Sequence, residues 1–128
     1  NVLFSALYNP LGSCALLLDI GRRSKIGFTL ICSQQTWAEA HRNLQLKLQK
    51  EFAVPDIVKI FSVVWKGPCL IPLPAKDQHV FMGALELGAH ILLTGDHRHF
   101  GPYMNRPQLT QGILVQTVVQ FLERGRVA

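Results

Sequence analysis

The chain has 128 residues, a hydrophobic content of 48% and a formal net charge of +5. These values exclude a disordered chain, fit one globular domain over residues 1–128, and give a basic surface that suits a polyanionic partner such as a nucleic acid. The three cysteines form no C-x-x-C pair, which argues against a disulfide scaffold or a zinc site and favours a cytoplasmic location. We expect no membrane span, because no apolar run is long enough, and we expect residues before Asn1 to be missing.

The first half of the chain predicts strands that alternate with helices. Ser13 and Ser33 are side chains that can cap helices, and Pro55 suits the first turn of another helix. The predicted elements, in order, are the remnant of a first strand at 1–6, a helix from 13 to about 23, a buried strand at 28–32, a helix from 34 to about 50, and a strongly apolar helix from 55 to 65.

The second half continues the alternation. A third strand is predicted at 69–73, and Asp77 is placed to cap a helix over 78–87 that ends in a left-handed turn at Gly88. The remaining predicted elements are a buried strand at 91–93, an irregular stretch at 97–112, a fifth strand at 113–115 and a closing helix at 118–124. This order implies a three-layer α/β/α fold with a mostly parallel five-stranded sheet.

The stretch from Lys76 to Phe100, KDQHVFMGALELGAHILLTGDHRHF, holds two acids in informative places. Asp77 stands at the start of a helix, and Asp96 follows the next strand. Ligands bind at the carboxyl ends of parallel strands, so both acids can face one cleft. Glu39, in the helix after the second strand, can converge on the same edge of the sheet.

Clustered carboxylates repel each other unless a cation lies among them, and Mg²⁺ or Mn²⁺ prefers such hard oxygen ligands. A bound metal lowers the pKa of water and stabilises charge on a phosphoryl group, which is the basis of metal-assisted phosphodiester hydrolysis. Each acid also has a simpler interpretation. Asp77 fits a helix cap, Glu39 a solvated helix position and Asp96 a turn residue.

The same residues resemble those of the PIN domain, a family of metal-dependent nucleases. The resemblance rests on Asp77, the helix with Ala84 and Gly88, the apolar strand and the sequence Thr94-Gly95-Asp96, while residues 1–6 are similar to the opening strand of the family. It implies a Mg²⁺- or Mn²⁺-dependent endoribonuclease that leaves a 5′-phosphate and a 3′-hydroxyl. Glu39, Asp77 and Asp96 would hold the metal and position the attacking water, and a fourth acid would lie immediately before Asn1.

Further residues can support the site. Ser5 and Thr94 match positions that often line the site in the family, although Thr94 could simply favour the end of the strand. Asn1 could orient the missing acid or simply bond backbone, and Arg98 suits a bidentate phosphate contact. Small members of the family are often toxins that an antitoxin protein neutralises, and they often form homodimers. His97 and His99 are interpreted as loop-surface residues.

Two alternatives to the nuclease stay open at this point. Without the first acid, a catalytically degenerate domain would bind RNA or a protein partner without cleaving it. A receiver-like phosphoacceptor with Asp96 as its acceptor is a weaker alternative. Metal dependence separates the nuclease from the binding domain, because charge-driven RNA binding needs no metal and weakens with salt. The receiver-like protein would take phosphate covalently from a donor and would not cleave RNA.

Overall fold

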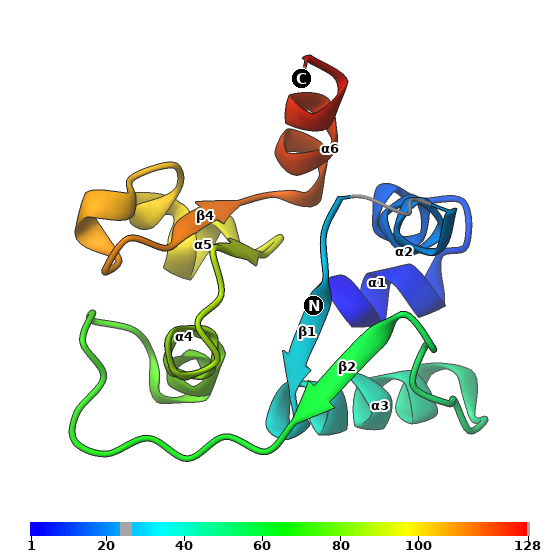
Figure 1. Ribbon diagram of the computed structural model, residues 1–128. Helices are drawn as coiled ribbons and strands as arrows, with labels where there is room; N and C mark the ends of the chain where they lie inside the picture. The colour runs from blue at the N-terminus through cyan, green and yellow to red at the C-terminus, as the bar shows by residue number, and fades with distance from the viewer. Residues whose placement is uncertain (24–26, 128) are drawn as a thin grey trace. The chain divides into compact units, whose positions relative to one another are not determined.

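The computed structural model describes residues 1–23 and 27–127 and shows a mixed α/β protein, in which helices alternate with short parallel strands (Figure 1). The chain divides into two compact units, Asn1–Phe61 and Ser62–Ala128. Each unit has its own cluster of buried apolar side chains and is described by itself. The predicted α/β class is therefore confirmed.

The N-terminal unit contains a two-stranded parallel sheet. Its elements are α1 (Val2–Tyr8), α2 (Ser13–Arg23), β1 (Leu30–Ser33), α3 (Gln34–Leu48) and β2 (Val58–Phe61). Leu30 lies opposite Val58 and Ser33 lies opposite Phe61 in the pairing of β1 with β2. Helix α3 packs on both strands, and α1 packs on α2 and α3.

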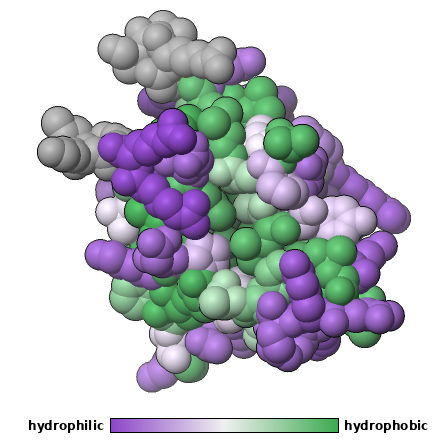
Figure 2. All heavy atoms as spheres, turned by 90° about the vertical axis from the view of Figure 1, so that its right-hand side faces the viewer, coloured by the Kyte–Doolittle hydropathy of each residue, from purple (hydrophilic) through white to green (hydrophobic). Residues whose placement is uncertain are grey.

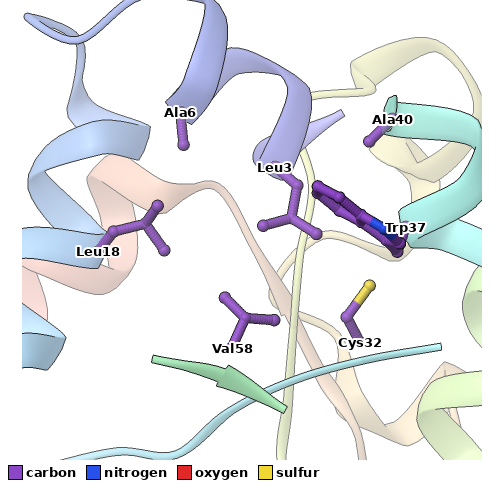
Figure 3. Close-up of a cluster of buried hydrophobic side chains, with 7 residues drawn as sticks. All are labelled: Leu3, Ala6, Leu18, Cys32, Trp37, Ala40 and Val58. Carbon is purple, nitrogen blue, oxygen red and sulfur yellow. The ribbon is translucent and has the colours of Figure 1, made fainter. Parts of the chain in front are cut away.

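Side chains from every element of this unit meet in its core (Figure 3). Leu18 of α2 and Val58 of β2 are 5% and 7% exposed, and they point toward the same apolar interior as Trp37 of α3. The other buried members of this cluster are Leu3, Ala6, Cys32 and Ala40. Burial raises the pKa of the Cys32 thiol to about 11, so this cysteine is a small apolar core residue, as its strand position predicts.

Helix α3 begins where its sequence predicts. The side-chain oxygen of Ser33 accepts a hydrogen bond of 3.1 Å from the Thr36 backbone N–H and so caps the helix. The helix ends at Leu48, and Gln49 takes a left-handed conformation with φ of 53°. Helix α2 also has the predicted bounds.

The C-terminal unit contains a second two-stranded parallel sheet. Its elements are α4 (Ala75–Glu86), β3 (Ile91–Leu93), α5 (His97–Phe100), the 3-10 helices η1 (Gly101–Tyr103) and η2 (Pro107–Leu109), β4 (Leu114–Gln116) and α6 (Val118–Val127). Leu93 lies opposite Gln116 in the pairing of β3 with β4. Phe81, Phe100 and Val115 are almost fully buried in its core, so α4, α5 and β4 are held together by apolar packing.

Helix α4 ends as predicted. Gly88 has φ of 68°, a left-handed conformation that side chains disfavour. The Ala89 N–H donates to the Ala84 carbonyl at 2.9 Å, and the Gly88 N–H donates to the Leu85 carbonyl at 3.1 Å. These bonds satisfy the last carbonyls of the helix and turn the chain toward β3.

The connection from β3 to β4 is the stretch that the sequence predicts to be irregular. It contains α5, η1 and η2, and several hydrogen bonds fix it to β4 and to its own backbone. The Asn105 N–H donates to the Val115 carbonyl at 2.8 Å, and the fully buried Thr110 hydroxyl donates to the Ile113 carbonyl at 2.6 Å. The connection is therefore anchored along its length.

Three sequence predictions of elements are wrong. Residues 2–8 form helix α1 and not a strand, because Leu3 and Ala6 face the core at helical spacing and Phe4 stacks on Tyr8 with ring centroids 5.2 Å apart. Residues 58–61 form strand β2 and not part of a helix. There, burial alternates between inward and outward residues, which is the period of a strand.

The third error is the strand at 69–73, which has no ladder partner among the described residues. Ile71 and Leu73 are buried as expected, but Pro72 and Pro74 lack the N–H groups that a ladder needs. Asp77 is also not a helix cap. Helix α4 begins earlier, with Pro74 as its N-cap, and Asp77 is the third residue of the helix.

The predicted five-stranded sheet is not seen in the described residues, whose strands form two sheets of two strands each. The last predicted strand and the closing helix are present as β4 and α6. Within the described part of the chain, no single helix has the length and apolarity to cross a membrane. Helices α1 and α2 pass that test only together, and the pair is bent by 92°.

Apolar side chains are exposed on the N-terminal unit. Tyr8, Leu11 and Leu16, from α1, α2 and the turn between them, are 48%, 97% and 43% exposed. Figure 2 shows hydrophobic side chains over the middle of the face that lies on the right in Figure 1, with hydrophilic side chains around them.

Candidate metal centre

Three side chains of the C-terminal unit converge at one point. Asp77 comes from the first turn of α4, Asp96 from the residue before α5, and His99 from α5 itself. One ligand atom from each lies within 4.8 Å of the others. Their side chains are 16%, 23% and 20% exposed, so all three are largely withdrawn from water while the group stays accessible.

Asp77 is held by the first turn of α4. Its backbone N–H donates to the Pro74 carbonyl at 2.9 Å, and a carboxylate here is stabilised by the positive end of the helix dipole. The turn is anchored on both sides, because Leu73 and Phe81 are buried in the core and the Gln78 side-chain amide donates to the Leu73 carbonyl at 3.2 Å.

Asp96 is held where β3 leads into α5. The Thr94 N–H donates to the Gln116 carbonyl at the end of β4, and the Thr94 hydroxyl oxygen accepts the Asp96 N–H at 3.1 Å. Asp96 then caps α5, since its Oδ1 accepts the backbone N–H groups of Arg98 and His99 at 3.0 and 3.1 Å. Capping uses Oδ1, and Oδ2 faces His99.

The His99 ring lies between the two carboxylates. Its Nδ1 is 2.9 Å from Asp96 Oδ2 and 2.9 Å from Asp77 Oδ2. The contact with Asp96 has the geometry of a hydrogen bond, whereas the contact with Asp77 does not. Asp77 Oδ2 is therefore a fully buried carboxylate oxygen that has no hydrogen-bond partner in the structure.

The surroundings favour the ionised form of Asp96. Desolvation is the largest influence and raises the pKa of this carboxyl group, but the hydrogen bonds from the His99 backbone and ring, the charge of that ring and the Arg98 N–H together outweigh it. The net effect is a pKa below the ordinary value for Asp. Asp96 is thus a carboxylate at neutral pH.

This donor set fits a divalent cation. A buried carboxylate oxygen without a hydrogen-bond donor carries a large desolvation cost, which a metal ion would offset. Asp77, Asp96 and His99 could hold such an ion, with Asp77 Oδ2, Asp96 Oδ2 and a ring nitrogen as ligand atoms.

Two of the three predicted acids, Asp77 and Asp96, lie next to each other as predicted. Thr94 is buried and contacts the backbone of Asp96, which agrees with a supporting role, and Arg98 is exposed beside it. The role of Arg98 in phosphate binding stays a prediction.

The other predicted site residues lie in the N-terminal unit. Glu39 is exposed on α3, and its role as a metal ligand stays a prediction. Asn1 is the N-cap residue of α1, and Ser5 is exposed on that helix. Ser5 lines an open pocket of about 510 Å³ together with Tyr8, Asn9, Gly12, Ser13 and Cys14.

His99 is the residue that the sequence prediction missed. It was expected on a loop surface, but it is about four-fifths buried between two acids. The sequence spacing of His99 could have indicated this position. A residue three positions after the Asp that caps a helix lies on the same side of the helix as that Asp. His97, two positions earlier, is exposed as expected.

Comparison of the chain with protein-family models, curated proteins and solved structures finds no match.

Proposed function

We propose that the protein is a metal-dependent endoribonuclease of the PIN type, which uses Mg²⁺ or Mn²⁺ to hydrolyse phosphodiester bonds. The observation that carries the proposal is the buried Asp77 Oδ2, which lacks a hydrogen-bond donor and lies with Asp96 Oδ2 around one ring nitrogen. The resemblance of the stretch from Lys76 to Phe100 to the PIN domain supports it. The proposal includes the three-layer α/β/α arrangement of that family.

The residues of the C-terminal unit have different roles in the proposed reaction. Asp77 and Asp96 would hold the metal, and Thr94 fixes the backbone from which the Asp96 carboxylate projects. When bound, the metal would lower the pKa of water and offset charge on the phosphoryl group. Arg98 is exposed next to Asp96 and can contact a phosphate of the RNA backbone. The resemblance also assigns a metal-binding role to Glu39, which lies on α3 in the N-terminal unit, and that role stays a prediction.

The test is cleavage of a mixed RNA pool in Mn²⁺, in Mg²⁺ and in EDTA. It compares the wild type with Asp77→Asn and Asp96→Asn, and with Glu86→Gln as a matched control that changes an exposed acid at the other end of α4. We expect metal-dependent cutting that both Asn variants lose and Glu86→Gln keeps. Products should carry a 5′-phosphate and a 3′-hydroxyl.

Other outcomes identify the alternatives. Cutting that persists in EDTA, or in both Asn variants, would contradict the proposal and indicate a contaminant or another site. RNA binding without cutting would favour a catalytically degenerate domain.

An antitoxin partner, a homodimer and a cytoplasmic location complete the proposal by analogy with small members of the family. An antitoxin would be detected as a protein that suppresses both RNA cleavage and Mn²⁺ binding by this chain. The oligomeric state is measured directly by sedimentation.

A further inference from the structure

We propose that His99 is a third ligand of the metal, through Nδ1, and that it makes the site prefer Mn²⁺ to Mg²⁺. This inference rests on the proposed function, because it concerns the metal that Asp77 and Asp96 would hold. It adds a residue that neither the resemblance nor the sequence pattern assigns to the site.

The position of the ring is the first support. His99 Nδ1 is 2.9 Å from one oxygen of each carboxylate, so the three atoms already converge as ligands of one small ion would. The residue is fixed from two directions. Its backbone N–H donates to Asp96 Oδ1, and the next side chain, Phe100, is 2% exposed in the core.

A purely structural role accounts poorly for this arrangement. A ring nitrogen carries at most one hydrogen, and the hydrogen-bond geometry of Nδ1 is met by Asp96 and not by Asp77. The bond to Asp96 leaves Asp77 Oδ2 buried without a hydrogen-bond donor. A cation bound by both oxygens and by Nδ1 would satisfy all three atoms at once, with the ring proton on Nε2.

The chemistry of the ligands then sets the choice of metal. Mg²⁺ prefers an octahedron of oxygen ligands and keeps several waters, whereas imidazole nitrogen binds first-row transition metals more strongly. Two carboxylates and one imidazole are therefore expected to bind Mn²⁺ more tightly than Mg²⁺. Removing the imidazole should lower the affinity for Mn²⁺ more than the affinity for Mg²⁺.

The first experiment is pulsed EPR of Mn²⁺ bound to the wild-type protein. A coordinated imidazole gives a ¹⁴N modulation of the electron spin echo, and this modulation changes to that of ¹⁵N when the protein is made with ¹⁵N-labelled histidine. We expect a histidine nitrogen on the bound metal. This measurement needs no substitution and no catalytic activity.

The second experiment assigns the nitrogen and measures selectivity. His99→Gln should lose the nitrogen modulation and bind Mn²⁺ at least about tenfold more weakly, since even outer partners of metal ligands contribute about 10–100-fold. His97→Gln, which changes the exposed histidine of the same helix, should keep the modulation and the affinity. Competition with Mg²⁺ should show a smaller preference for Mn²⁺ in His99→Gln than in the wild type.

Two results would overturn the inference, and they have different meanings. In the first result, the wild type binds Mn²⁺, Asp77→Asn loses that binding, and the wild-type spectrum shows no histidine nitrogen. This result would exclude His99 as a ligand, while the proposed function stands. No Mn²⁺ binding by the wild type would overturn both. If His99→Gln does not fold, the wild-type spectrum still decides the matter together with four other variants. A histidine signal that is retained in His41→Gln, His79→Gln, His90→Gln and His97→Gln leaves His99 as the bound residue.

Discussion

The two carboxylate oxygens of Asp96 have different tasks. Oδ1 accepts two backbone N–H groups at the start of α5, and Oδ2 faces the His99 ring. One side chain thus supports both the local fold and the candidate metal site. Substitutions that remove one task but keep the other can separate the two.

Asp96→Asn should remove metal binding and leave the fold nearly intact. Asn keeps an oxygen that can accept the Arg98 and His99 N–H groups, and Asn and Asp are comparable caps. Asp96→Ala loses the cap as well, which costs about 0.5–2 kcal/mol. We expect both variants to lose Mn²⁺ binding, and urea unfolding to show a larger loss in the free energy of unfolding for Ala than for Asn. Equal losses of stability would contradict the division of tasks.

The lowered pKa of Asp96 predicts a dependence of stability on pH. A carboxyl group whose pKa is lower in the folded state contributes stability above its unfolded pKa of about 3.9 and loses that contribution as the pH falls through its folded pKa. The free energy of unfolding of the metal-free wild type, relative to Asp96→Asn, should therefore be larger at about pH 6 than at about pH 2. A difference that stays constant over this range would show that the ionised form has no advantage in the fold.

The site could be predicted only in part from the sequence. Asp77 and Asp96 were found because an acid near a helix start and an acid after a strand are placed by local chemistry. His99 was missed because its role depends on how closely α4 approaches α5, which no pattern within one segment encodes. The simple interpretation of Asp96 as a turn residue was also partly right, since it caps α5.

At the scale of elements, two of the predicted helix ends are confirmed, although the predicted cap at Asp77 is wrong. Ser33 marks the start of α3, and Gly88 marks the end of α4. The errors came from short apolar stretches, where strand and helix periods are hard to distinguish. Val58 to Phe61 was assigned to a helix, although its burial alternates. Asn1 to Ala6 was assigned to a strand, although Leu3 and Ala6 have helical spacing.

Two glycines of the C-terminal unit give a matched pair of substitutions. A Cβ at Gly88 or at Gly101 would meet no atom within 4 Å, so neither substitution causes a clash. Gly88 has φ of 68°, and Ala there should destabilise the protein by about 1–2 kcal/mol through backbone strain. Gly101 has helical angles of −49° and −46°, and Ala there should stabilise it by about 0.4–1 kcal/mol.

Thermal unfolding of the two variants measures this contrast. The melting temperature should fall for Gly88→Ala and stay level or rise for Gly101→Ala. The opposite order would mean that α4 does not end in a left-handed residue. Because neither position belongs to the metal centre, Mn²⁺ affinity should be unchanged in both folded variants.

At the scale of the whole molecule, the net charge of +5 predicts how the affinity for RNA, the proposed substrate, depends on salt. Basic side chains that contact phosphates release counterions, so the logarithm of the affinity should fall linearly with the logarithm of the salt concentration. Arg98→Gln should reduce that slope by about 0.7 for single-stranded RNA if Arg98 contacts one phosphate. Filter binding in EDTA at several salt concentrations measures the slope. An unchanged slope would remove Arg98 from the RNA contact.

The α/β class was predictable because strands alternate with helices along the whole chain. The grouping of strands was not, because pairing depends on contacts between distant segments. Pro72 and Pro74 illustrate this limit. The apolar residues beside them suggested a strand, while the missing N–H groups kept Ile71 and Leu73 in the core without a ladder.

The hydrogen bonds that anchor the connection from β3 to β4 have a consequence for its motion. The Asn105 N–H bonds to β4, the Ile113 N–H bonds to the Thr110 carbonyl, and the Thr110 hydroxyl is fully buried. Amide hydrogens in such bonds exchange with solvent deuterium only when the segment opens. The Asn105 and Ile113 amides should therefore exchange about as slowly as those of β4. Asp96 and His99, at the start of this connection, would then keep the same positions before and after ligand binding. The proposed RNA substrate would therefore bind a preformed site and would not induce its formation.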